Sequence, residues 1–126
     1  MDKSKKGFNR FIKSFGYAFE GIKYSLCHEQ NIIVMFILGV IAVTLSFVFQ
    51  ISYMERLTII FLIGIILPLE FINTAIEAVV DLHDGDKKSK YGKVAKDCAS
   101  AALLIASIIA LIVGIIIFIP RIIALF

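Results

Sequence analysis

The sequence predicts an all-α membrane protein, with three transmembrane helices and an N-terminal amphipathic helix on the membrane surface. Hydrophobic residues make up 60% of the 126 residues, which is more than an ordinary soluble domain contains, so the predicted solvent is a bilayer. Three apolar stretches each approach the roughly 20 residues that a spanning helix needs. The segment before them is apolar along one helical stripe.

The predicted spans cover residues 30–52, 56–81 and 94–120, within one membrane domain of residues 1–126. The stretches 30–54 and 98–120 carry no charged side chain, whereas the second span is interrupted by Glu70 and Glu77. The basic start is followed by no compact apolar stretch with a cleavage site, so we do not expect a cleaved signal peptide. Insertion then depends on the spans themselves.

Lysine and arginine predict the orientation of the chain. The segment before the first span and the loop between the second and third spans hold eleven of them, whereas the other side holds Arg56 and Arg121. Basic residues gather on the cytosolic side of membrane proteins. We therefore expect a multi-pass plasma-membrane protein with a cytosolic N-terminus and an external C-terminus.

Residues 6–26 are predicted to form the surface helix. Its polar side carries Arg10, Tyr17 and Glu20. Its other side carries apolar residues at helical spacing: Phe8, Phe11, Ile12, Phe15, Phe19, Ile22 and Leu26. Such a helix is expected to lie in the cytosolic interface of the membrane.

The stretch EFINTAIEAVVD places polar groups in the second span. Glu70, Asn73, Glu77 and Asp81 are spaced 3, 4 and 4 residues apart and therefore share one helical face. Asp81 lies at the predicted cytosolic end, and Glu70 lies about 16 Å deeper at 1.5 Å per residue. Carboxyls inside a membrane are costly and usually functional. Hydrogen-bonded carboxyls that hold helices together would be the structural alternative.

Other polar residues are predicted at the same level. Glu29 precedes the first span, and Lys96 with Asp97 begins the third, all on the cytosolic side. Carboxylates hold Mg²⁺, a lysine binds phosphate, and a buried carboxylate can accept the proton of an attacking hydroxyl. The set favours phosphoryl transfer from ATP over a proton or ion pathway, because such a pathway gains nothing from phosphate-binding bases. A structural adaptor would leave the polar column unexplained.

EFINTAIEAVVD followed by KVAKDCASAALLIA resembles the small prokaryotic integral-membrane lipid kinases, the diacylglycerol kinase and undecaprenol kinase family. GFNRFIKSFGYAFEGIKYSL and CHEQNI extend the resemblance to nearly the whole chain. It implies a homotrimer with active sites between subunits on the cytosolic side, and a lipid and a nucleotide as substrates.

By matching position, the resemblance makes Glu70 the general base and Glu29 and Glu77 the Mg²⁺ ligands. It assigns nucleotide contacts to Arg10, Tyr17, Asn73, Lys96 and Asp97, with Asp81 in support. The loop 83–91 lacks the Glu-aromatic-His stretch usual in the family. Asn73-Thr74 and the ending from Gly114 to Pro120 resemble the Gram-positive branch, which favours undecaprenol over diacylglycerol as the lipid.

Overall fold

The chain folds into four helices joined by short connections. The computed structural model describes residues 3–126, in which α1 (Lys3–His28), α2 (Gln30–Val48), α3 (Tyr53–Asp84) and α4 (Lys90–Ala124) account for the secondary structure, with no strand in that range. The last three helices are long and apolar enough to cross a membrane. The predicted all-α fold with three such helices is therefore confirmed.

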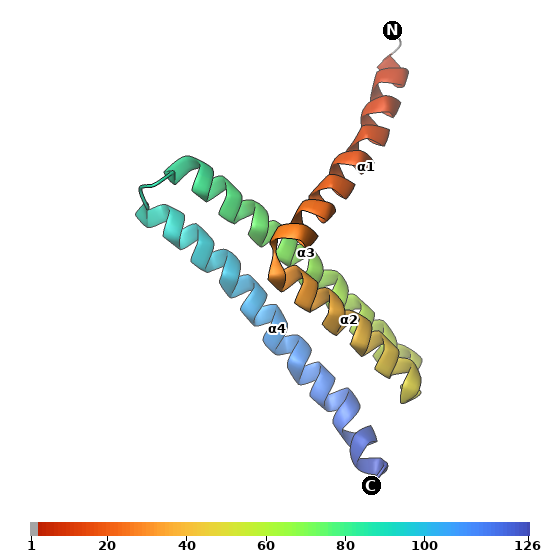
Figure 1. Cartoon of the computed structure of the whole chain (residues 1–126). Helices are drawn as coiled ribbons and strands as arrows, with labels where there is room; N and C mark the ends of the chain where they lie inside the picture. The colour runs from red at the N-terminus through yellow and green to blue at the C-terminus, as the bar shows by residue number, and fades with distance from the viewer. Residues whose placement is uncertain (1–2) are drawn as a thin grey trace.

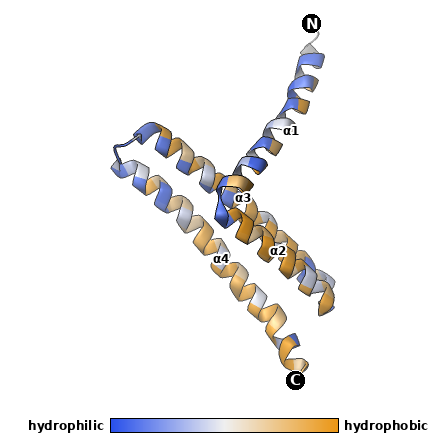
Figure 2. Cartoon of the chain, in the orientation of Figure 1, coloured by the Kyte–Doolittle hydropathy of each residue, from blue (hydrophilic) through white to orange (hydrophobic). Residues whose placement is uncertain are grey.

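The three apolar helices lie side by side, and α1 projects away from them (Figure 1). Both α2 and α4 pack against α3. Hydrophobic residues cover α2, α3 and α4, and hydrophilic residues gather at the turn between α3 and α4 (Figure 2). On α1 the aromatic stripe is exposed in the single chain, with Phe8 at 62% and Phe19 at 66% of full exposure. That stripe is available to meet lipid or another protein surface.

Side-chain caps define the turns. Ser52 accepts a hydrogen bond from the Glu55 backbone N–H, and the Glu55 carboxylate accepts one from the Ser52 N–H, which is a capping box at the start of α3. Ser89 caps α4 by accepting from the Gly92 N–H at 3.0 Å. The Ser89 hydroxyl and backbone N–H both donate to Asp84 at the end of α3. The turn thereby connects the ends of α3 and α4 directly.

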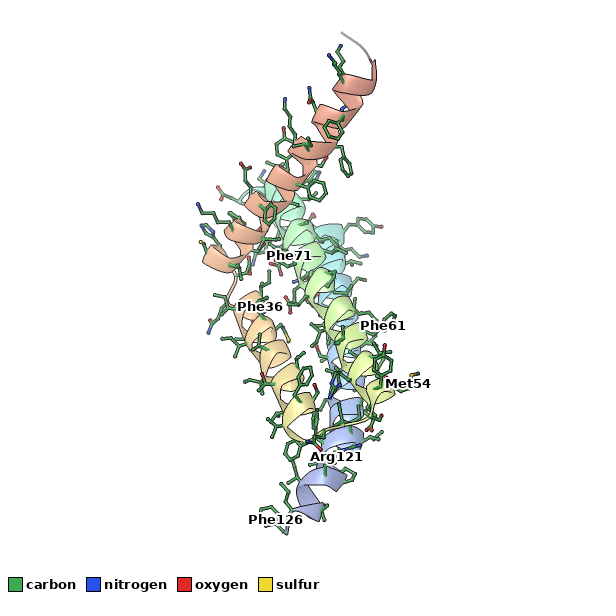
Figure 3. All side chains as sticks on the ribbon, turned by 90° about the vertical axis from the view of Figure 1, so that its right-hand side faces the viewer. Phe36, Met54, Phe61, Phe71, Arg121 and Phe126 are labelled. Atoms are coloured by element: carbon green, nitrogen blue, oxygen red, sulfur yellow. The ribbon has the colours of Figure 1, made fainter. Side chains whose placement is uncertain are left out.

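The opposite end of the bundle is closed by an ion pair. The guanidinium of Arg121 on α4 donates to both carboxylate oxygens of Glu55 on α3, at 2.7 and 3.0 Å. Arg121 lies at the end of the bundle away from α1 (Figure 3). Beside it, Arg56 donates to the Ser46 carbonyl at 3.2 Å and lies 4.2 Å from the centre of the Phe47 ring. These contacts join the ends of α2, α3 and α4.

The helices differ in length from the predicted spans. α2 ends at Val48, because Gln50 takes a positive φ of 49° in the turn that follows. α3 continues through Pro68, and α4 continues through Pro120 to Ala124. Arg121 donates to the Ile117 carbonyl at 2.8 Å, next to the position where proline offers no backbone donor. This bond joins the last turns of α4 through a side chain.

Among the glycines, Gly92 at the start of α4 has the least free space around it. A Cβ there would lie 2.7 Å from the Ser89 hydroxyl and 2.9 Å from the Val80 side chain. We expect Gly92→Ala to lower the free energy of unfolding in detergent by about 1–3 kcal/mol through overpacking. Gly16→Ala on α1, where nothing lies within 4 Å, should leave it unchanged or raise it by up to about 1 kcal/mol. Equal unfolding midpoints for the two variants would contradict this interpretation of the turn.

Candidate active site

The polar column lies on one face of the uninterrupted helix α3. Glu70 is buried at 4% of full exposure and Asn73 at 9%, whereas Asp81 is exposed. Glu77 lies between them and is half-buried. The column therefore leads from solvent at the α3–α4 turn to a carboxyl enclosed by the bundle.

Asn73 links the buried and the accessible parts of the column. Its side-chain Nδ2 donates to Glu77 Oε1 at 3.3 Å, which sets the orientation of the amide. Its Oδ1 is buried and has no hydrogen-bond partner among the residues that the structure describes. A buried acceptor without a partner is costly. A donor or cation from a bound substrate would satisfy it.

Glu29 reaches the column from the junction of α1 and α2. It is the N-cap residue of α2, with an extended backbone at φ −114° and ψ 107°. Glu29 and Glu77 both lie within electrostatic range of the Glu70 carboxylate. Phe71, the neighbour of Glu70, lies at the level where α1 joins the bundle (Figure 3). The charge of Glu70 is therefore influenced by Glu77 on the same helix and by Glu29 at the start of α2.

Lys96 lies at the solvent end of the column. Its Nζ contacts Asp81 Oδ1 at 2.6 Å, and Glu77 is also within electrostatic range. Asp97, the next residue, is paired with Lys93 at 2.8 Å on an exposed side of α4. The two predicted nucleotide-binding residues of α4 therefore have different partners. Lys96 pairs with a residue of the column, whereas Asp97 pairs with a lysine of its own helix.

Arg10 and Tyr17 are not brought to the column within one chain. Both are exposed, Tyr17 at 68%, and both belong to α1, which projects from the bundle (Figure 1). They can meet a column only through a movement of α1 or through another copy of the chain.

The lysine-rich connection between α3 and α4 forms a basic pocket near the column, which was not predicted from the sequence. The pocket lies between the ends of α3 and α4 and has a volume of about 500 Å³. Four lysines line it together with Asp84 and Asp97: Lys88, Lys90, Lys93 and Lys96. Their clustering in sequence was the available signal, because lysines close together near a carboxylate column suit a phosphate-bearing ligand.

The donor set fits Mg²⁺ only together with a substrate. Within residues 3–126, no three His, Cys, Asp or Glu side chains are close enough to hold a metal ion by themselves. Mg²⁺ usually binds through one or two carboxylates and the oxygens of substrate phosphates. Glu29 and Glu77 provide two carboxylates near Glu70, and Lys96 provides a phosphate-binding charge nearby.

Comparison with known proteins assigns the family. Residues 16–118 match the family described as prokaryotic diacylglycerol kinase. The undecaprenol kinase of Bacillus subtilis is 37% identical over 113 residues, which cover 90% of this chain and 91% of that protein. The diacylglycerol kinase of Escherichia coli K12 is 32% identical over 112 residues, which cover 89% of this chain and 91% of that protein.

A longer relative agrees with these two. The diacylglycerol kinase of Synechocystis is 33% identical over 114 residues, and the match spans 90% of this chain but 65% of that protein. The resemblance found in EFINTAIEAVVD and KVAKDCASAALLIA is therefore confirmed. With most of its length matched, and three helices long and apolar enough to cross a membrane, the chain belongs to the prokaryotic diacylglycerol kinase family of membrane lipid kinases.

Proposed function

We propose that this protein transfers the γ-phosphate of Mg-ATP to the hydroxyl of undecaprenol at the cytosolic face of the plasma membrane. The observation that carries the proposal is the buried Glu70 carboxyl at the inner end of a polar column that opens at Lys96. Such a column can receive a lipid hydroxyl inside the membrane and nucleotide phosphates from water. The 37% identity with an undecaprenol kinase supports undecaprenol as the acceptor.

In the proposed reaction, the lipid hydroxyl oxygen attacks the γ-phosphorus and its proton passes to the Glu70 carboxylate. The bond between the γ-phosphorus and the bridging oxygen of ADP breaks, so the products are the lipid phosphate and ADP. A base must lie within hydrogen-bond reach of the proton that it accepts. The burial of Glu70, at 4% of full exposure, would keep water from competing with the hydroxyl.

The remaining column residues bind the nucleotide in this proposal. Glu29 and Glu77 would hold Mg²⁺, which neutralises charge on the phosphates when bound. Lys96 exchanges its contact with Asp81 for a phosphate oxygen, so Asp81 acts as support for the lysine. The unpartnered Oδ1 of Asn73 would accept a hydrogen bond from a donor group of the nucleotide or contact its cation. Asp97 would lie beside the phosphate site, next to Lys93.

We further propose a homotrimer with active sites shared between subunits, a cytosolic N-terminus and an external C-terminus. Within one chain, α1 projects away from the column. Shared active sites would bring Arg10 and Tyr17 of one chain to the column of another. The excess of lysine and arginine on the α1 side and at the α3–α4 turn supports the orientation. Mass measurement in detergent tests the trimer, and impermeant labelling of single cysteines at each terminus tests the orientation.

Diacylglycerol is the second candidate acceptor, because relatives at 32% and 33% identity carry that name. The deciding experiment gives purified protein Mg-ATP with undecaprenol or diacylglycerol at equal mole fraction in the same vesicles. We expect the kcat/KM for undecaprenol to exceed that for diacylglycerol. Faster phosphorylation of diacylglycerol would reverse the assignment, and phosphorylation of neither lipid would contradict the proposed function.

Replacing the proposed base should slow the chemical step alone. Glu70→Gln keeps the shape of the side chain but cannot accept the proton, so kcat should fall by about 10² to 10⁴. KM for Mg-ATP should change little, because Glu70 is assigned to neither metal nor phosphate. Glu20→Gln on exposed α1 is the control and should retain kcat. A Glu70→Gln enzyme with normal kcat and raised KM would make Glu70 a binding residue, and Asp97 the next candidate base.

Replacing a proposed metal ligand should instead change the demand for Mg²⁺. In Glu77→Gln, the amide oxygen can still accept the Asn73 hydrogen bond, so insertion and assembly should persist. The Mg²⁺ concentration for half-maximal rate should rise at least about tenfold, the scale of weaker perturbations around metal ligands. Asp86→Asn removes an exposed carboxylate at the same end of the bundle and serves as the control. An unchanged Mg²⁺ titration for Glu77→Gln would remove Glu77 from the metal site.

A further inference from the structure

The turn between α3 and α4 holds a carboxylate that the proposed reaction does not use. Asp84 is the last residue of α3, and its side chain keeps only 9% of its full exposure. The Ser89 backbone N–H donates to Asp84 Oδ2 at 3.1 Å, and the Ser89 hydroxyl donates to Oδ1 at 2.9 Å. His83 Nδ1 also contacts this carboxylate at 2.9 Å. Because a buried carboxylate without partners is costly, these bonds fix the place of Ser89.

Ser89 passes this constraint on to α4. The same hydroxyl accepts a hydrogen bond from the Gly92 N–H at 3.0 Å and so caps the helix. A Cβ at Gly92 would collide with the Asp84 carboxylate and would lie 2.9 Å from the Val80 side chain. The first turn of α4 therefore packs directly against the last turn of α3. The position and the rotation of α4 relative to α3 are set at this contact.

Lys96 lies on the face of α4 that begins at this contact. Ser89 and Lys96 are seven residues apart, which is about two helical turns, and Asp81 and Asp84 are three residues apart on α3. Side chains on a helix lean toward its N-terminus, and the Lys96 ammonium contacts Asp81 Oδ1 at 2.6 Å. The two facing stripes thus meet twice, through Asp84 with Ser89 and through Asp81 with Lys96.

Only one of these two contacts is independent of the nucleotide. In the proposed function, Lys96 exchanges Asp81 for a phosphate oxygen, so the contact between them opens. The contact between Asp84 and Ser89 does not involve Lys96 and stays closed. A slip of α4 by one residue would move Lys96 by 1.5 Å along the axis and rotate it by 100°. The contact at the turn therefore keeps Lys96 at the column while its partner changes.

We infer that Asp84 and Ser89 are positioning residues, which hold α4 in the register that places Lys96 beside the polar column for a nucleotide phosphate. This inference rests on the proposed function. Neither residue acts on the nucleotide itself, because each acts through the start of α4. Asp84 also lies within electrostatic range of Lys96. Holding a binding group in place before the substrate arrives lowers the entropic cost of binding.

Removing the carboxylate tests the inference. Asp84→Ala breaks the contact with Ser89 but leaves the Ser89 cap on Gly92. The KM for Mg-ATP should rise roughly three- to tenfold. At saturating Mg-ATP, kcat should change little, because Glu70 lies about 21 Å away along α3 at 1.5 Å per residue. By charge alone, the loss of a carboxylate near bound phosphates would lower this KM, so a rise indicates lost positioning.

Two control variants separate positioning from charge and from stability. Asp86→Ala removes an exposed carboxylate from the same turn and should leave KM for Mg-ATP unchanged. Glu55→Gln weakens the pair with Arg121 at the other end of the bundle. It should lower stability but leave this KM unchanged. An equal rise of KM in Glu55→Gln would overturn the inference, since KM would then follow the stability of the bundle.

Substitutions of Ser89 provide a second pair of variants if Asp84→Ala does not fold. Ser89→Thr keeps a hydroxyl that can donate to Asp84 and accept from Gly92, so it should keep the wild-type KM for Mg-ATP. Ser89→Ala loses both bonds and should raise this KM by the factor found for Asp84→Ala. Equal KM values for the Thr and Ala variants, with equal exposure of Lys96 in the labelling below, would overturn the inference.

Labelling of amines tests the position of Lys96 without nucleotide or activity. Protein in vesicles is treated briefly with acetic anhydride, and acetylation of Lys96 is measured by peptide mass spectrometry relative to Lys13 on exposed α1. Ser89→Ala, which removes no charge, should raise this ratio, and Ser89→Thr should not. An unchanged ratio in Ser89→Ala would overturn the inference. A raised ratio with an unchanged KM would support the positioning of Lys96 and contradict only its proposed contact with the nucleotide.

Discussion

The burial of the Glu70 carboxyl in an apolar bundle is the constraint around which the rest of the structure is arranged. A carboxyl at membrane depth costs a few kcal/mol or more, and Glu70 is 4% exposed. Asn73, Glu77 and Asp81 continue its helical face toward water and carry a polar path to it. Because these residues share one uninterrupted helix, the path is rigid and needs no loop inside the membrane.

Two sets of polar contacts hold the bundle around that path. At the α3–α4 turn, Ser89 bonds to Asp84, and Lys96 contacts Asp81. At the other end, Arg121 pairs with Glu55. In a bilayer the hydrophobic effect does not drive helices together, so packing and interhelical hydrogen bonds carry more of the association. Because these bonds lie at the ends, the middle of the bundle is apolar, and a cavity of about 280 Å³ lies there between α2 and α4.

Along α3, an apolar half that lines a cavity between α2 and α4 is followed by the half that carries the polar column. Lys96 and the lysines of the neighbouring pocket lie at the solvent end of the column. The column stands between an apolar compartment and a basic one. Phosphoryl transfer from a soluble nucleotide to a membrane alcohol requires such a boundary, because neither substrate enters the solvent of the other. Family membership favours this chemistry over an ion pathway.

The sequence by itself determined the helices, the amphipathic character of α1, the column on α3 and the family, because each depends on residues close together along the chain. Helix periodicity is local, so the spacing of Glu70, Asn73, Glu77 and Asp81 could be converted into a shared face before any packing was known. The sequence already predicted Glu29 and Lys96 at the level of this column. Only the tertiary structure decided that Lys96 pairs with Asp81, that Asp97 pairs with Lys93, and that Asp84 and Ser89 join two helix ends. It also decided that α2 and α4 leave a cavity between them, and that α1, which carries Arg10 and Tyr17, projects from the bundle in a single chain. These features depend on the distances between helices, and the periodicity within a single helix does not determine those distances.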